Sequence, residues 1–130
     1  MNQKGDNKFS FSSRIKSFSF AFRGLHEILK NQYNFRIHLA VAVFVIIMGF
    51  IFKFNLAEWS VLILTIGSVL SLEAINTALE YFVDLVSPDY NELAGKIKDI
   101  SAGAVLISAF IAIIIGGILF IPKIIEHIFK

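Results

Sequence analysis

The sequence predicts an all-α membrane protein made of one N-terminal amphipathic surface helix and three transmembrane helices. Hydrophobic residues make up 56 % of the 130 residues, and the mean hydropathy is +0.72. A soluble chain this short would expose too much of that apolar surface to water. Three uncharged runs follow a basic amphipathic segment along the chain. On length alone, we expect residues 1–130 to form a single domain.

The composition also excludes several functional classes. Because the chain has no cysteine, it has no disulfide, no thiolate metal site and no cysteine nucleophile. The net charge is only +2, and no Arg-rich patch alternates with aromatic residues, so we expect no nucleic-acid partner. The first apolar run begins near residue 37, behind a long charged segment. That is too late and too charged for a cleaved signal peptide, so we expect this segment to belong to the mature protein.

The predicted surface helix covers about residues 12–33. Apolar residues recur there at alternating spacings of three and four, and basic residues occupy the opposite side. The apolar positions are Ile15, Phe18, Phe22, Leu25 and Leu29. A basic amphipathic helix of this kind lies in the headgroup plane of a membrane. Packing against its own helix bundle is the alternative, and the two are compatible.

The three predicted spans cover about residues 35–54, 57–86 and 92–121. The uncharged run 100–121 has 22 residues, and a span needs about 20. The runs 39–52 and 59–72 have 14 each, so they cross the membrane only with polar ends. Two buried helices of a soluble bundle are the alternative, but the chain has too few polar residues to coat such a bundle.

Capping and turn residues mark the ends of these helices. Asn55, followed three residues later by Glu58, is typical of a helix N-cap. The pair Ser87-Pro88 is expected to end the second span, and Pro122 the third.

Basic residues indicate the orientation. Seven of the twelve Lys and Arg residues precede the first span, and two more lie between the second and third. These nine are Lys4, Lys8, Arg14, Lys16, Arg23, Lys30, Arg36, Lys96 and Lys98, whereas Lys53, Lys123 and Lys130 fall on the other side. The positive-inside rule then places the N-terminus in the cytoplasm. We therefore expect a multi-pass protein of the cell (inner) membrane, with Trp59 at the outer interface.

The second span carries five polar residues close together. They are Glu73, Asn76, Thr77, Glu80 and Asp84. At about 100° per residue, Glu80 and Asp84 lie roughly 20° to either side of Glu73. Ionisable groups in a span are costly and by default mark function, so this shared face is expected to line a polar cleft.

The depths of these carboxylates suit phosphoryl transfer from a cytosolic nucleotide to a membrane alcohol. Glu73 lies about 21 Å and Glu80 about 31 Å along the helix from Trp59, in a hydrocarbon core about 30 Å thick. Glu80 would hold Mg²⁺ on the ATP phosphates, and Lys98 would stabilise the charge on the transferred group. Glu73, deeper and beside acyl chains, would be the general base for a lipid hydroxyl. The glycine-rich phosphate loops of other kinases are absent from the sequence.

Two motifs carry a family resemblance. They read Glu73-Ala-Ile-Asn76-Thr-Ala-Leu-Glu80-Tyr-Phe-Val-Asp84 and Lys98-Asp99-Ile-Ser-Ala-Gly-Ala-Val. Together they resemble the prokaryotic diacylglycerol kinase and undecaprenol kinase family. The likeness extends over nearly the whole chain, including residues 19–24 and 34–38.

The resemblance implies a homotrimer whose active sites lie between neighbouring subunits. It also implies that Glu73 is the catalytic base, that Glu80 is a metal ligand and that Asn76 orients the reacting groups. By the same likeness, ATP is contacted by Glu80, Asp89, Tyr90, Asn91, Lys98 and Asp99. Arg36 is expected to bind or orient the substrate.

One position departs from the family pattern. Gln32 stands where the family usually has a second acidic metal ligand. Its amide oxygen can ligate Mg²⁺ without charge, so Gln32 stays a candidate ligand and the number of metal ions is open. The substrate, undecaprenol or diacylglycerol, is also open, although residues 34–38 look more like the undecaprenol branch.

Two other functional classes compete with a lipid kinase. An ion or proton transporter also uses intramembrane carboxylates, but it would distribute polar groups through the membrane depth, whereas here they cluster at the cytoplasmic edge. A scaffold that oligomerises through the third span has no need for three carboxylates on one face. We therefore expect ATP-dependent phosphorylation of a membrane lipid alcohol.

Overall fold

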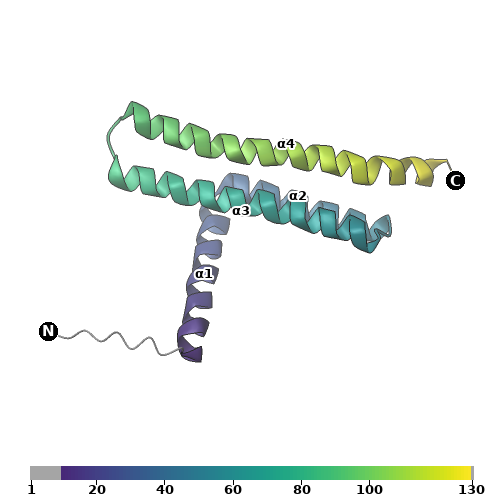
Figure 1. The fold of residues 1–130 in the computed structure, drawn as a ribbon, viewed down its shortest axis with the longest axis horizontal. Coiled ribbons are helices and arrows are strands. Elements are labelled where there is room, and N and C mark those ends of the chain that lie inside the picture. The colour runs from purple at the N-terminus through teal and green to yellow at the C-terminus, as the bar shows by residue number, and fades with distance from the viewer. Residues whose placement is uncertain (1–9, 130) are drawn as a thin grey trace.

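The computed structural model describes residues 10–129, and in that range the chain is helical, with no strand (Figure 1). The helices are α1 (Phe11–Asn31), α2 (Tyr33–Ile51), α3 (Leu56–Val86) and α4 (Glu92–Ile128). The last three are long and apolar enough to cross a membrane. The predicted fold class, one N-terminal helix and three spans, is therefore confirmed. Lys4, Lys8 and Lys130, which contribute to the charge asymmetry, lie outside the described residues.

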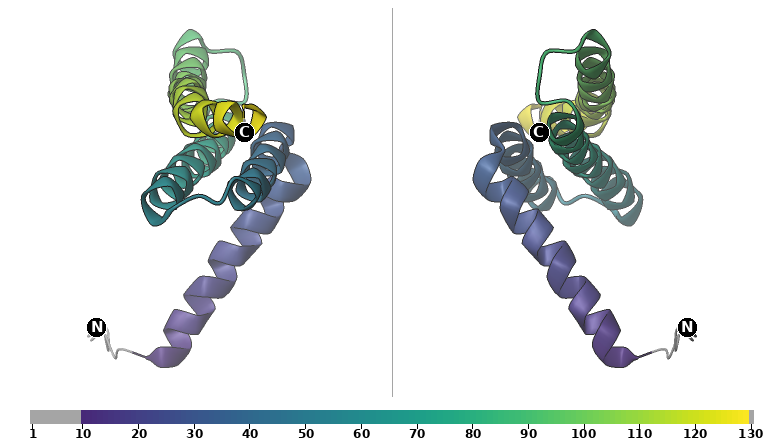
Figure 2. Two further views of the ribbon diagram at one scale, coloured as in Figure 1. Left: turned by 90° about the vertical axis from the view of Figure 1, so that its right-hand side faces the viewer. Right: turned by 90° about the vertical axis from the view of Figure 1, so that its left-hand side faces the viewer.

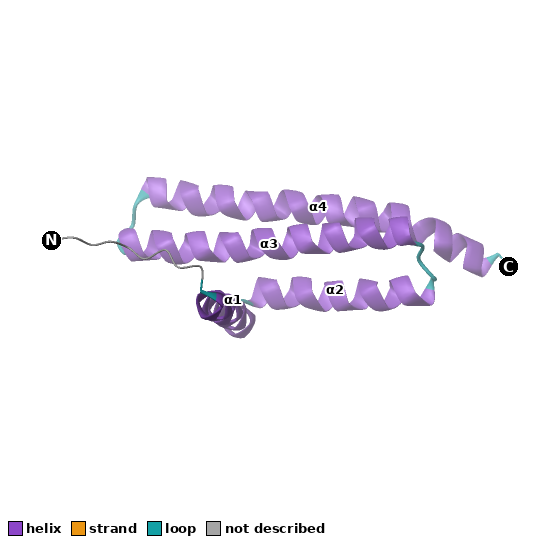
Figure 3. Ribbon diagram, turned by 60° about the horizontal axis from the view of Figure 1, so that its bottom comes forward, coloured by secondary structure: helices purple, strands orange, loops and turns teal. Residues whose placement is uncertain are grey.

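Helix α3 is the centre of the bundle. It lies between α2 and α4 (Figure 3) and packs against both, whereas α2 and α4 do not pack against each other. The chain returns from α3 into an antiparallel α4 through the short link 87–91. Side chains on α3 and α4 near this link can therefore meet.

Helix α1 projects away from the three spans and contacts α2 and α3 near its C-terminal end (Figure 2). Ile28 is its buried residue, while Ile15, Phe18 and Phe22 are exposed. An exposed apolar face beside basic residues is what a membrane surface would cover.

Gln32 separates α1 from α2. Its backbone is extended, with φ −111° and ψ 113°, and this single non-helical residue lets the chain change direction. The predicted surface helix therefore ends at Asn31, and the first span begins at Tyr33, two residues earlier than the sequence indicates.

The ends of α2 and α3 can be compared with the predicted capping and turn residues. Asn55 and Glu58 form both hydrogen bonds of a capping box, 2.7 Å and 3.0 Å long, so that prediction is confirmed. Helix α3 ends at Val86, directly before Ser87, as expected. Helix α2 ends at Ile51, before the predicted residue 54, because Lys53 adopts φ 52° in the turn.

The prediction that Pro122 ends the third span is wrong. Helix α4 continues through Pro122 to Ile128. A proline removes one backbone N–H donor, and contacts beyond it hold the final turns in place. Lys123 pairs with Glu58 at 3.2 Å, and the rings of His127 and Phe52 meet edge to face.

Aromatic rings join the spans at the end opposite the α3–α4 link. The Trp59 ring lies 4.7 Å from Phe50 and 5.9 Å from Phe54, centroid to centroid. Phe54 in turn lies 4.9 Å from Phe120 of α4. This cluster joins α2, α3 and α4 at the end of the bundle that lies away from Glu73, Asn76 and Glu80.

Candidate active site

The polar face of α3 changes from buried to exposed along the helix. The side chains of Glu73, Asn76 and Thr77 are 2 %, 6 % and 1 % exposed. Glu80 is half-buried, and Asp84 is exposed near the end of the helix. The five polar residues thus form one row on α3 that is buried at Glu73 and exposed at Asp84, toward the α3–α4 link.

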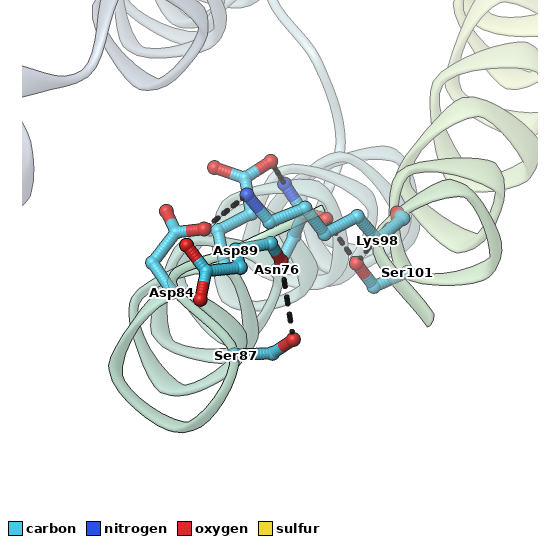
Figure 4. A network of polar contacts seen from close by, with 7 residues as sticks. Asn76, Asp84, Ser87, Asp89, Lys98 and Ser101 are labelled. Carbon is cyan, nitrogen blue, oxygen red and sulfur yellow. Dashed lines mark hydrogen bonds and ion pairs between the residues drawn. The ribbon is translucent and has the colours of Figure 1, made fainter. Parts of the chain in front are cut away.

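A polar network connects this row to α4 (Figure 4). The Asn76 amide Nδ2 donates to Glu80 Oε1 at 3.1 Å. The Ser101 hydroxyl donates to Asn76 Oδ1 at 2.6 Å. Lys98 extends from α4 to form an ion pair with Asp84. Two helices therefore position one set of donors and carboxylates.

Local spacing and the antiparallel link explain why these residues meet. Asn76, Glu80 and Asp84 are four residues apart, so they lie on one side of α3. Ser101 lies nine residues into α4 and Asn76 lies ten residues before the end of α3. At about 1.5 Å per residue, both are roughly 14 to 15 Å from the link. The two side chains are therefore at the same depth.

The loop residues expected to contact ATP lie outside this network. Tyr90 is 96 % exposed, and the backbone carbonyl of Asp89 accepts a hydrogen bond from the Ser87 hydroxyl at 3.4 Å. Asn91 is the N-cap of α4, because its Oδ1 accepts from the backbone N–H groups of Leu93 and Ala94. The Oδ1 atom is thus engaged within the helix, and the NH₂ group is the part of this side chain that can contact a nucleotide.

Asp99, also expected at the ATP site, is exposed on α4, next to Lys98. In the described part of the chain, Asp99 forms no ion pair with a basic side chain, and the neighbouring Lys98 pairs with Asp84 instead.

Gln32 and Arg36 lie near the start of α2. Gln32 Nε2 donates to the Tyr81 hydroxyl at 3.3 Å, which brings the α1–α2 junction to the residue next to Glu80. Arg36 stacks over the Tyr33 ring at 4.3 Å and stays exposed. The structure therefore brings Gln32, but not Arg36, to α3.

Sequence reasoning missed two residues of the site, Ser101 and Tyr81. Ser101 lies three residues after Lys98, on the same face of α4, and this spacing was a usable signal. Tyr81 adjoins Glu80 in the motif, but nothing in the sequence pairs it with Gln32.

The donor chemistry fits a magnesium ion shared with a nucleotide. Within residues 10–129, no three His, Cys, Asp or Glu side chains gather closely enough to hold a metal ion alone. Mg²⁺ usually keeps several waters and is held by one or two carboxylates together with substrate phosphates. Glu80 is a half-buried carboxylate of the kind such an ion needs, and the Gln32 side chain contacts Tyr81, the residue next to Glu80.

An apolar groove of about 420 Å³ runs between α2, α3 and α4. Val69, Leu70, Ala112 and Gly116 are among its lining residues, and Val69 and Leu70 lie about one helical turn before Glu73 on α3. The buried carboxylate is therefore close to a groove that suits a hydrocarbon chain.

Comparison with known proteins identifies the family. Residues 19–120 match the family model described as prokaryotic diacylglycerol kinase. The chain belongs to the prokaryotic diacylglycerol kinase family. Undecaprenol kinase of Bacillus subtilis (strain 168) is 41 % identical over 118 residues, which cover 91 % of this chain and 96 % of that protein.

Two diacylglycerol kinases are also similar to this family member. The protein of Synechocystis sp. (strain ATCC 27184 / PCC 6803 / Kazusa) is 43 % identical over 113 residues, covering 86 % of this chain and 65 % of its own length. The protein of Escherichia coli (strain K12) is 28 % identical over 114 residues, which cover 88 % of this chain and 93 % of that protein.

Family membership makes this chain a lipid kinase, an enzyme that phosphorylates a lipid alcohol in a membrane. The family and the reaction class predicted from the two motifs are confirmed. The transporter alternative finds no support.

Proposed function

We propose that this kinase transfers the γ-phosphoryl group of ATP to the hydroxyl of a lipid alcohol, with Glu73 as general base. One observation carries the proposal. Along α3, the buried Glu73 carboxylate comes after Leu70, which lines the apolar groove, and before Asn76, where the polar network that includes Lys98 begins. A lipid chain and a nucleotide can approach such a group from opposite sides.

The reaction needs one proton acceptor and one displacement. The lipid hydroxyl oxygen attacks the γ-phosphorus, and its proton passes to the Glu73 carboxylate. The bond between the γ-phosphorus and the bridging oxygen breaks, and ADP leaves with that oxygen. Protonated Glu73 then returns its proton to water.

Lys98 is positioned to stabilise the phosphate charge. Its ion pair with Asp84 is partly open to water, with the side chains 37 % and 63 % exposed. Exposed pairs contribute about 0 to 1 kcal/mol, so the phosphates of ATP can displace Asp84. Glu80 and Gln32 would hold Mg²⁺, which neutralises phosphate charge when it is bound, and Asn76 would keep Glu80 oriented.

The remaining predicted contacts surround this centre. Asp89, Tyr90, Asn91 and Asp99 lie at the exposed link and at the start of α4, on the side from which a cytosolic nucleotide would arrive. Arg36, at the start of α2, would contact the lipid headgroup.

We propose undecaprenol, rather than diacylglycerol, as the preferred alcohol. The undecaprenol kinase of Bacillus subtilis matches this chain over nearly the full length of both proteins, and residues 34–38 favour the same branch. We further propose that the protein is a homotrimer in the cell (inner) membrane. We propose that its N-terminus is cytoplasmic, and the excess of basic residues before α2 supports this orientation.

A direct phosphorylation assay tests the function. Purified protein in mixed micelles receives γ-labelled ATP, Mg²⁺ and either undecaprenol or dioleoylglycerol at equal mole fraction. We expect label in both lipids and a higher kcat/KM for undecaprenol, with none after chelation of Mg²⁺. The proposal fails if neither lipid is labelled, and the substrate assignment fails if dioleoylglycerol is preferred.

A further inference from the structure

Two buried serines on α4 differ in one contact. Ser101 and Ser108 lie two helical turns apart, are 8 % and 9 % exposed, and each hydroxyl lies within hydrogen-bond distance of the carbonyl three residues earlier. Only Ser101 also reaches α3, where its hydroxyl meets Asn76 Oδ1 at 2.6 Å. The Ser101 side chain therefore links α4 to the candidate active site.

A hydroxyl has a single proton to donate. Ser101 has two acceptors, Asn76 Oδ1 at 2.6 Å and the Lys98 carbonyl at 2.9 Å. The Asn76 contact is the shorter of the two. Donation to Asn76 directs the amide oxygen toward α4 and leaves the NH₂ group facing Glu80.

The reversed amide would be unfavourable. It would place the Asn76 carbonyl oxygen about where Nδ2 now lies, 3.1 Å from Glu80 Oε1. A carbonyl oxygen and an ionised carboxylate are both acceptors, so no proton would join them. Glu80 thus sets the amide orientation, and the Ser101 hydroxyl donates to the oxygen that this orientation presents to α4.

We propose that Ser101 is a positioning residue of this kinase, which fixes the Asn76 amide and through it the Glu80 carboxylate. The inference rests on the proposed role of Glu80 at the metal–nucleotide site. Because Ser101 and Asn76 are buried, water cannot readily replace the hydroxyl. Removal of the hydroxyl leaves Asn76 Oδ1 without this donor, and Glu80 loses a fixed partner.

Manganese binding separates positioning from catalysis. Mn²⁺ replaces Mg²⁺, and its binding to purified protein with a non-hydrolysable ATP analogue is followed by electron paramagnetic resonance. We expect Ser101→Ala to weaken Mn²⁺ binding about threefold to tenfold, the scale of one hydrogen bond. The kcat should fall by a similar factor, while the KM for the lipid stays unchanged.

Ser108→Ala is the matched control. It removes a buried hydroxyl from the same helix and the same type of carbonyl contact, but this hydroxyl forms no hydrogen bond with the described residues of α3. We expect Mn²⁺ binding and kcat within twofold of wild type. Equal losses in Ser101→Ala and Ser108→Ala would overturn the proposal.

A double variant tests whether Ser101 acts through Asn76. In an Asn76→Ala background, Ser101→Ala should not weaken Mn²⁺ binding further, because the partner is already absent. A full additional loss would mean that Ser101 acts by another route and would overturn the inference. Should Ser101→Ala be unstable in detergent, Ser101→Cys keeps a weaker donor and should lose part of the affinity, whereas wild-type affinity would contradict the proposal.

Different results would contradict the proposed function and the proposed role of Ser101. An inactive wild type, or unchanged Mn²⁺ binding in Glu80→Ala, would remove the metal–nucleotide site itself. Normal wild-type activity with an unaffected Ser101→Ala would remove only the role of Ser101.

Discussion

Lys98 on α4 forms an ion pair with Asp84 on α3, and both side chains stay partly open to water. The pair joins the two helices close to the link that connects them. Because an exposed pair is weak, its replacement by a Lys98–phosphate contact costs little. The ion pair with Asp84 is therefore compatible with the proposed transfer of Lys98 to the phosphates of ATP.

Replacement of Lys98 should damage catalysis much more than replacement of its partner. We expect Lys98→Met to lower kcat/KM for ATP by about 100-fold or more, since loss of one donor that stabilises developing charge has an effect of this order. Asp84→Asn should lower kcat/KM for ATP by less than tenfold. ADP release in a coupled assay measures the rates of both variants. Lys96→Met is the control, because Lys96 pairs with Glu92 on the surface, and an equal loss there would contradict the specific role of Lys98.

Glu73→Gln should abolish most lipid phosphorylation without unfolding the protein. A positioned general base contributes on the order of 10²- to 10⁴-fold, and glutamine keeps the shape of the side chain without the proton acceptor. Label transfer from ATP measures the rate, and thermal unfolding in detergent checks the fold. A rate near wild type would exclude Glu73 as the base. Glu92→Gln, on the exposed start of α4, should leave the rate unchanged.

The metal site should respond in opposite directions to two substitutions. Glu80→Ala removes the charged ligand and should strongly raise the Mg²⁺ concentration at half-maximal rate. Gln32→Glu adds a negative charge at the neutral position and should lower the Mg²⁺ concentration at half-maximal rate. Titration of activity with Mg²⁺ measures this midpoint for both variants. Glu27→Gln, on α1 and hydrogen-bonded to Asn31, should not move the midpoint, and an unchanged midpoint in Glu80→Ala would contradict the metal role.

Gly49→Ala should destabilise the aromatic cluster. An added Cβ would lie 2.9 Å from the Trp59 ring atom Cη2, so the ring or the helix must shift, at a cost of about 1 to 3 kcal/mol. Because Trp59 is the single tryptophan, its fluorescence reports unfolding directly. Gly24→Ala meets no atom within 4 Å and should be at least as stable as wild type. Equal stability of the two variants would show that the Trp59 ring accommodates the added methyl group at Gly49 without destabilising the protein.

The proposed orientation is testable because the chain has no cysteine. Tyr90→Cys on the α3–α4 link and Leu56→Cys on the α2–α3 side replace residues that are 96 % and 84 % exposed. A thiol reagent that cannot cross membranes should label Leu56→Cys in intact spheroplasts, and Tyr90→Cys only after lysis. The reverse pattern would place the proposed nucleotide side outside the cell.

Much of the fold followed from local sequence patterns. The hydropathy of the three runs located the spans, and Asn55 with Glu58 located the start of α3, because helix propensity and capping act within a few residues of the chain. The four-residue spacing of Asn76, Glu80 and Asp84 likewise placed them on one face of the helix.

Packing between distant segments decided the rest. The sequence by itself determined which residues share the polar face of α3, since that depends only on helical geometry. Only the tertiary structure decided that Ser101 contacts Asn76, that Gln32 reaches Tyr81, and that α4 continues through Pro122 to pair Lys123 with Glu58. Each of these contacts joins residues at least 25 positions apart, and such partners are set by how whole helices pack, which local patterns do not encode.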